Sequence, residues 1–164
     1  MKDLILNEIR RRLFDEGIPR AKKCLNLLTE EEIWYRPNEN SNAMGNLILH
    51  LNGNVRQWII SALGGESDIR VRQSEFDARG NITRAELMAI LENLEADLWP
   101  VLDNITEEKL VQTYQVQGYS ETGIAILIHV VEHFSYHVGQ MTYFVKAFKD
   151  LDTGYYKGQN LDAK

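Results

Sequence analysis

The residues of this sequence best suited to chemistry are its four histidines. His129, His133 and His137 follow one another at intervals of four residues in the segment HVVEHFSYHVGQ, and His50 lies far upstream in NLILHLNGN. Residues four apart project from one face of an α-helix, so His133 and His137 can bind a single metal ion. The alternative is that these imidazoles are ordinary histidines of a solvated or packed helix surface.

A third metal ligand would have to come from another part of the chain, and His50 is the only histidine outside this segment. Leucines flank it on both sides, so we expect it on an apolar helical stripe. An imidazole buried there needs a hydrogen-bond partner or a metal to offset its lost hydration. Three neutral imidazoles leave a divalent metal its full charge and an open position, where it lowers the pKa of water or deprotonates a thiol.

Four long stretches with apolar residues at helical spacing must position these histidines. We expect helices over residues 2–28, 43–63, 83–102 and 120–149. Ser41 or Asn42 is the expected N-cap of the second helix, and the glycine pair at 64–65 ends it. Thr83 begins a capping box at the start of the third helix. Ser120 is expected to cap the fourth.

The connections between these helices are long and polar. Thr29 begins a short capped turn in TEEEIW. The segment 66–82 is long for a structureless connection, and we expect it to form part of the rim of a site. LVQTYQVQGY, residues 110–119, alternates like a strand but has no evident partner, so we interpret it as an extended loop. The prediction is an all-α four-helix bundle forming one domain over residues 1–150, followed by a weakly ordered tail over 151–164.

Composition narrows the class of protein. The chain has 164 residues, of which 44% are hydrophobic and 26% charged, as in an ordinary globular protein. The net charge of −6, without a basic cluster, argues against a nucleic-acid partner. No apolar run spans a bilayer and the first residues lack the pattern of a signal peptide, so we expect a cytoplasmic protein. The single cysteine, Cys24, excludes an intramolecular disulfide and is interpreted as a small buried hydrophobe.

Two of these segments, NAMGNLILHLNGNVRQW and HVVEHFSYHVGQM, resemble the DinB/YfiT-like superfamily of metal-dependent enzymes. The resemblance covers about residues 3–150 and is most specific in the pattern H-x-x-x-H-x-G-Q at 133–140. It implies a four-helix bundle with one metal held by a histidine of the second helix and two of the fourth. Carried over to this chain, the ligands are His50, His133 and His137. The metal is expected to be Zn or Ni, with Fe or Mn as alternatives.

Three further residues lie near the expected site. His129 is one helical turn before His133, at the edge of the site or in the packing around it. Asn54 follows His50 by one turn, and Gln140 lies close to the stripe of His133. Either amide could hydrogen bond to a ligand histidine and fix its tautomer. The alternative is that both are bonded to backbone.

The resemblance also suggests a reaction, because relatives include transferases that use low-molecular-weight thiols. The expected function is therefore transfer of such a thiol to an electrophile. Metal-dependent hydrolysis and a non-catalytic metal-binding module of the stress response are the alternatives. The expected partners are a small-molecule substrate and a second copy of the chain in a homodimer. Arg70, Arg72 and Arg79 could bind an anionic substrate, although we favour their pairing with Glu75 and Asp77.

Overall fold

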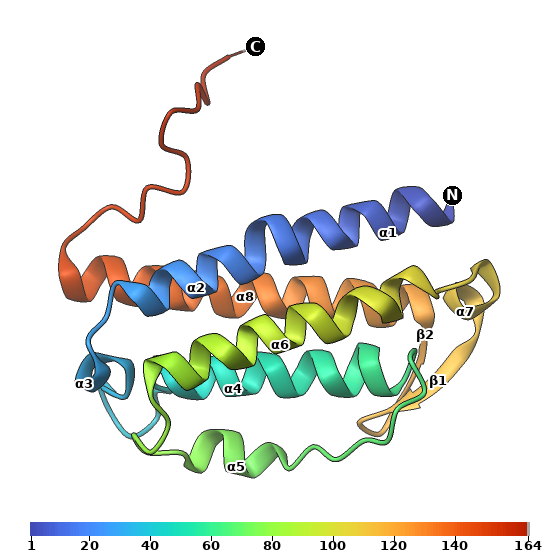
Figure 1. Ribbon diagram of the computed structural model, residues 1–164, viewed down its shortest axis with the longest axis horizontal. Helices are drawn as coiled ribbons and strands as arrows, with labels where there is room; N and C mark the ends of the chain where they lie inside the picture. Colours follow the sequence, from blue (N-terminus) through green and yellow to red (C-terminus); the bar gives the residue numbers. More distant parts are fainter. Residues whose placement is uncertain (164) are drawn as a thin grey trace.

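The computed structural model describes residues 1–163, and long helices packed side by side make up most of it (Figure 1). The first is a continuous rod in three parts: α1 (Lys2–Arg10), a π-helical segment η1 (Arg11–Gly17) and α2 (Ile18–Asn26). Pro19 lies in the first turn of α2, directly after the π-helical segment, and it has no N–H to donate to the preceding turn of the rod. The π-helical segment lies directly before this proline and lets the rod pass it without ending. The mostly helical fold predicted from the sequence is confirmed.

The second rod carries His50 and consists of α4 (Met44–Val55) continued by the π-helical segment η2 (Arg56–Ser61). It buries apolar residues on its inner face, among them Ile48, Leu51 and Ile59. Its N-cap is Ala43, so the prediction of Ser41 or Asn42 was wrong. Capping comes from inside the helix, because the side chain of Asn46 accepts a hydrogen bond from the Ala43 N–H at 3.1 Å.

The other two long helices are α6 (Arg84–Asp103) and α8 (Gly123–Lys149). The capping box predicted at Thr83 is present, as is the one at Thr29 before the short helix α3 (Glu30–Ile33). Ser120 was predicted to begin the last helix, but Thr122 is its N-cap. Ser120 instead belongs to a strand.

That strand is part of a hairpin, which corrects the interpretation of residues 110–119 as a loop. After the short helix α7 (Glu107–Val111), strand β1 (Thr113–Val116) pairs with β2 (Tyr119–Thr122) in antiparallel register. The two turn residues, Gln117 and Gly118, have φ values of 51° and 83°, as a tight hairpin turn requires. The partner strand that was not evident from the sequence begins directly after this two-residue turn.

The direction of the helices explains the long connection 66–82. Figure 1 shows that α4 and α6 run in the same direction, so the chain between them must return along the length of the bundle. It does so outside α4 and includes a short helix, α5 (Arg72–Asp77), that the sequence did not predict. This path brings polar residues of the connection over the helix that carries His50.

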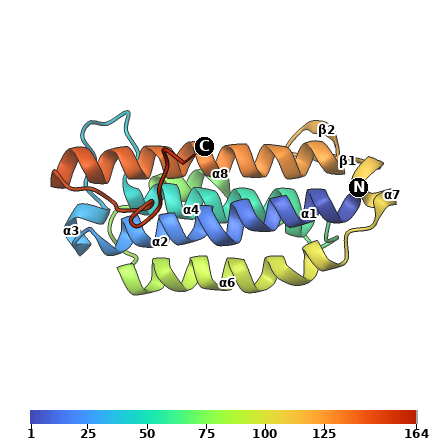
Figure 2. The same ribbon diagram turned by 90° about the horizontal axis from the view of Figure 1, so that it is seen from above.

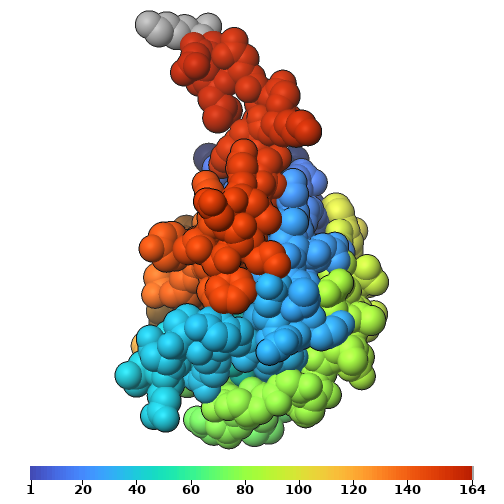
Figure 3. Space-filling model, turned by 90° about the vertical axis from the view of Figure 1, so that its left-hand side faces the viewer, coloured from blue at the N-terminus to red at the C-terminus, as the bar shows by residue number. Residues whose placement is uncertain are grey.

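Packing closes the bundle around one core. Helix α8 packs against α2 and α4, and α6 packs against the same two elements from the other side (Figure 2). After α8 the chain continues outward from the end of the bundle (Figure 3), although the Tyr155 hydroxyl lies 3.0 Å from Cys24 Sγ and 2.9 Å from Thr142 Oγ1. Among the described residues, no helix is long and apolar enough to cross a membrane.

Candidate metal centre

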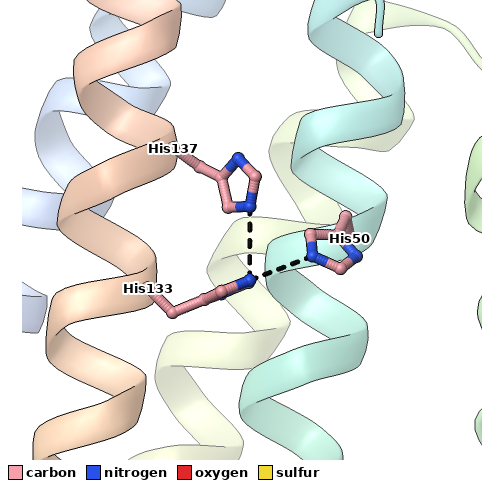
Figure 4. A group of neighbouring side chains, drawn as sticks. All are labelled: His50, His133 and His137. Carbon is pink, nitrogen blue, oxygen red and sulfur yellow. Dashed lines mark hydrogen bonds between the residues drawn. The ribbon is translucent and has the colours of Figure 1, made fainter.

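Three histidines from two facing helices meet at the seam between α4 and α8. The Nε2 atom of His133 lies 3.1 Å from His50 Nε2 and 3.2 Å from His137 Nε2 (Figure 4). One ligand nitrogen of each ring lies within 4.8 Å of the others. A neutral imidazole has a single N–H, so three converging nitrogens of this kind are better matched to a cation than to one another. The cluster is compatible with a metal site.

The surroundings of His133 and His137 favour the neutral form that binds metals. Burial, together with the smaller effect of the neighbouring histidines and Arg70, lowers the pKa of His133 to about 3. Burial also lowers the pKa of His137, against a smaller upward effect of its hydrogen bond with Gln140. A histidine that is already neutral at pH 7 need not lose a proton before it donates its lone pair to a metal.

Two of the three rings have their outer nitrogen held by another side chain. His137 Nδ1 lies 2.8 Å from Oε1 of Gln140, three residues further along the same helix. His50 Nδ1 lies 2.9 Å from Oε2 of Glu75 on α5. By contrast, His133 Nδ1 is buried and has no hydrogen-bond partner among the described residues.

Glu75 is the residue at this site that sequence reasoning missed. Its carboxylate is buried and accepts hydrogen bonds from Arg70, with which it forms the predicted ion pair. Burial acts to raise the pKa of Glu75, but the hydrogen bonds with His50 and Arg70 outweigh it and the pKa is lowered. The other arginine pairs of this segment were predicted wrongly: within the described chain Asp77 accepts from Gln73 instead of an arginine.

His129 and Asn54 contact each other at the edge of the three-histidine cluster, where the His129 ring also stacks on His133. The His129 ring stacks on Trp58 with centroids 3.8 Å apart, and its Nε2 lies 3.4 Å from Asn54 Nδ2. Its ring centroid is 5.5 Å from that of His133. Trp58 in turn donates from Nε1 to the side chain of Gln117 in the hairpin turn, so the hairpin borders the site on this side.

Cys24 lies outside the cluster. It is completely buried between helices α2 and α8, where Thr142 and Tyr155 contact its sulfur. Burial raises the pKa of this thiol, which keeps it protonated and unreactive. The cluster therefore has no protein thiolate among its donors, and its donor set is made of imidazoles alone.

Solved structures with the same fold come from three bacteria. The DinB-like protein YjoA of Bacillus subtilis shares 19% identity, with a TM-score of 0.69 over 96% of this chain and 99% of its own. A DinB-like protein of Bacillus cereus shares 16%, with a TM-score of 0.67 over 85% and 90%. A conserved protein of Enterococcus faecalis shares 16%, with a TM-score of 0.73 over 92% and 98%.

No curated protein matches the chain by sequence. A family of proteins of unknown function, DUF1572, matches it over residues 4–155. The structural neighbours confirm the DinB-like fold that the resemblance implied. The chain therefore belongs to the DUF1572 family and has the fold of DinB-like proteins.

Proposed function

We propose that His50, His133 and His137 bind one divalent transition metal, and that the protein uses it to transfer a low-molecular-weight thiol to an electrophile. The observation that carries the metal site is the convergence of three Nε2 atoms from two helices. Zn and Ni are the first candidates, because imidazole ligands suit both metals. Fe and Mn are alternatives that the ligand set does not exclude. A divalent ion held by these three imidazoles would keep its full charge and would activate a thiol or a water as a nucleophile at neutral pH.

The residues around the cluster support a small-molecule substrate. His50 and His137 are buried, while His133 is half-buried, so access to the cluster is limited. The half-buried His129 ring, stacked on the buried Trp58, borders the cluster on one side with aromatic groups. Because Cys24 is remote and buried, a substrate thiol would meet no protein thiolate in competition for the metal.

Transfer of a thiol balances without an external oxidant or reductant. The S–H bond of the thiol breaks, the sulfur forms a bond to an electrophilic carbon, and the displaced group leaves with the electron pair of its bond. The released proton passes to solvent or to the leaving group. The proton comes from the thiol itself, so the step requires no proton from His50, His133 or His137.

The experiment has two stages. Elemental analysis of the purified protein should find close to one divalent transition metal per chain, and His133→Ala should remove it. A Co-substituted sample is then mixed with physiological thiols, and a change in its visible spectrum is expected only when thiol is added. The same sample should consume a model electrophile only with thiol present.

Each other outcome selects an alternative. Turnover of esters or amides without thiol would establish a hydrolase. Metal binding without a spectral response to any physiological thiol, and without turnover, would leave a non-catalytic metal-binding module. A chain that takes up no metal even after refolding with Zn or Ni would overturn the metal site itself.

A further inference from the structure

A buried ion pair lies directly behind His50. Arg70 donates from Nε to Glu75 Oε1 at 2.7 Å and from Nη2 to Glu75 Oε2 at 2.9 Å. The side chains of Arg70, Glu75 and His50 are only 4%, 8% and 7% exposed. Glu75 Oε2 also lies 2.9 Å from His50 Nδ1, so one carboxylate serves both a guanidinium and an imidazole.

A helix-interior glycine makes room for this carboxylate. Gly53 lies in α4 three residues after His50, where glycine is less favourable than alanine by about 1 kcal/mol. A Cβ atom at Gly53 would lie 2.0 Å from Glu75 Oε1 and 2.9 Å from Arg70 Nε. A side chain at residue 53 would therefore have to displace the ion pair from its place beside His50.

Arg70 is itself fixed by the helix that carries the ligand. Its Nη1 donates to Gln57 Oε1 at 2.9 Å, one turn beyond Gly53. Gln57 donates in turn to Asp68 at 2.7 Å, which ties the connection to the same face of the rod. The carboxylate of Glu75 is thus held at both oxygens, and its position does not depend on His50 alone.

The contacts at His50 Nδ1 identify which atom carries the proton. Arg70 Nη2 also lies 3.2 Å from Nδ1 and would donate to it if the nitrogen were bare. The distance to Glu75 is shorter, at 2.9 Å, and Nη2 already donates to the same carboxylate. A carboxylate paired with arginine only accepts hydrogen bonds, so the proton belongs on Nδ1. Nε2, which faces His133, is then left with its lone pair free.

We propose that Glu75, held by Arg70 and admitted by Gly53, is a positioning residue that fixes His50 in the tautomer able to bind a metal through Nε2. This inference rests on the proposed metal site. It assigns the support of one ligand, His50, to residues of the connection between α4 and α6. A carboxylate behind a metal-binding histidine orients the ring and strengthens its donor nitrogen. The segment 66–82 is therefore a component of the metal centre as well as a covering chain.

The test compares metal affinity in four variants by competition with a coloured chelator, using Zn or Co. Glu75→Gln and Glu75→Ala should each bind the metal about 10–100-fold more weakly than the unaltered protein. Gly53→Ala should weaken binding in the same direction, because its new methyl group displaces the carboxylate although alanine favours the helix. Asp77→Asn is the control, since it removes a carboxylate of the same short helix that is exposed and bonded only to Gln73.

A second readout separates positioning from a merely structural role. In the metal-loaded, ¹⁵N-labelled protein, His50 should show an Nδ1–H proton shifted downfield by its hydrogen bond to a carboxylate. This resonance should lose its downfield shift in Glu75→Gln. Thermal unfolding of the metal-free variants shows how far each change affects the fold alone.

The outcomes are distinct. Equal metal affinity of Glu75→Gln, Glu75→Ala and the unaltered protein would overturn the positioning role while leaving the metal site intact, as would an Nδ1–H resonance unchanged in Glu75→Gln. If the unaltered protein binds neither Zn nor Co, the proposed function fails and the inference fails with it. Weaker binding in the Glu75 and Gly53 variants, with Asp77→Asn unchanged, would establish the assignment.

Discussion

The rings of Trp58 and His129 are stacked with centroids 3.8 Å apart and an interplanar angle of 23°. This contact turns His129 toward the second rod and the hairpin, although it lies only one helical turn before His133. The Nε2 atom of His129 lies 3.4 Å from Asn54 Nδ2, a contact outside the three-histidine cluster. His129 and His133 therefore share a helix face and stack with centroids 5.5 Å apart, but the closest contacts of His129 are with Trp58 and Asn54.

We predict that replacing His129 will leave most of the metal affinity, whereas replacing His133 or His137 will abolish tight binding. Each of these two replacements leaves only two histidine ligands, which bind the ion much more weakly than three do. Metal content after dialysis against a weak chelator measures the difference. Loss of metal in His129→Ala as complete as in His133→Ala would show that the ligand assignment is wrong.

The metal-free protein should lose stability as the pH falls from about 7 toward 5. Burial lowers the pKa of His129, His133 and His137, that of His133 from 6.5 to about 3. Between these two values the unfolded chain binds protons that the folded protein does not, so the free energy of unfolding rises with pH. The free energy of unfolding is therefore highest above pH 6.5. Thermal unfolding of the metal-free protein between pH 7.5 and 5 measures how much of it is lost.

The matched variant for this pH dependence is His133→Gln, which lacks one of the three groups. Its melting temperature should fall less steeply over the same range. Carboxyl groups contribute little to the pH dependence there, because their ordinary pKa of 4.5 lies below pH 5. A melting temperature independent of pH between 7.5 and 5 in the unaltered protein would contradict the neutral, buried state of these imidazoles.

Two glycines in helical segments should respond to alanine in opposite ways. A Cβ at Gly17 would lie 2.9 Å from the ring of Phe134, which is buried and follows His133 on α8. Gly17→Ala should therefore destabilise the fold by roughly 1–3 kcal/mol through overpacking. A Cβ at Gly139 meets nothing within 4 Å, so Gly139→Ala should stabilise α8 by up to about 1 kcal/mol. Urea unfolding of both variants measures the contrast, and two changes of the same sign would contradict this account of the contact between η1 and α8.

We also predict that the chain forms a homodimer. Tyr136 and Tyr143, seven residues apart on α8, are 64% and 76% exposed and present a pair of aromatic rings on one helix face. Sedimentation at high protein concentration should give a species of about twice the 18.9 kDa chain mass. Tyr143→Lys should shift it toward the monomer, and a single species near the chain mass in the unaltered protein would refute the dimer.

The sequence by itself determined the features that depend on neighbouring residues. The capping boxes at Thr29 and Thr83 formed as predicted, since a box involves residues three apart. The shared face of His133 and His137 follows from a spacing of four on one helix. Local patterns of this kind need no knowledge of the remaining chain.

Only the tertiary structure decided what lies behind and beside these residues. Glu75 reaches His50 across 25 positions because α4 and α6 run in parallel, which forces the connection back over α4. The sequence shows a glycine at position 53 but not why a glycine stands there. The side chain that Gly53 makes room for, Glu75, belongs to a distant segment. Ser120 was placed in a helix cap because no pairing partner was evident, and pairing with Gln115 put it in a strand. Contacts of this kind depend on the path of the chain in space, which local spacing does not specify.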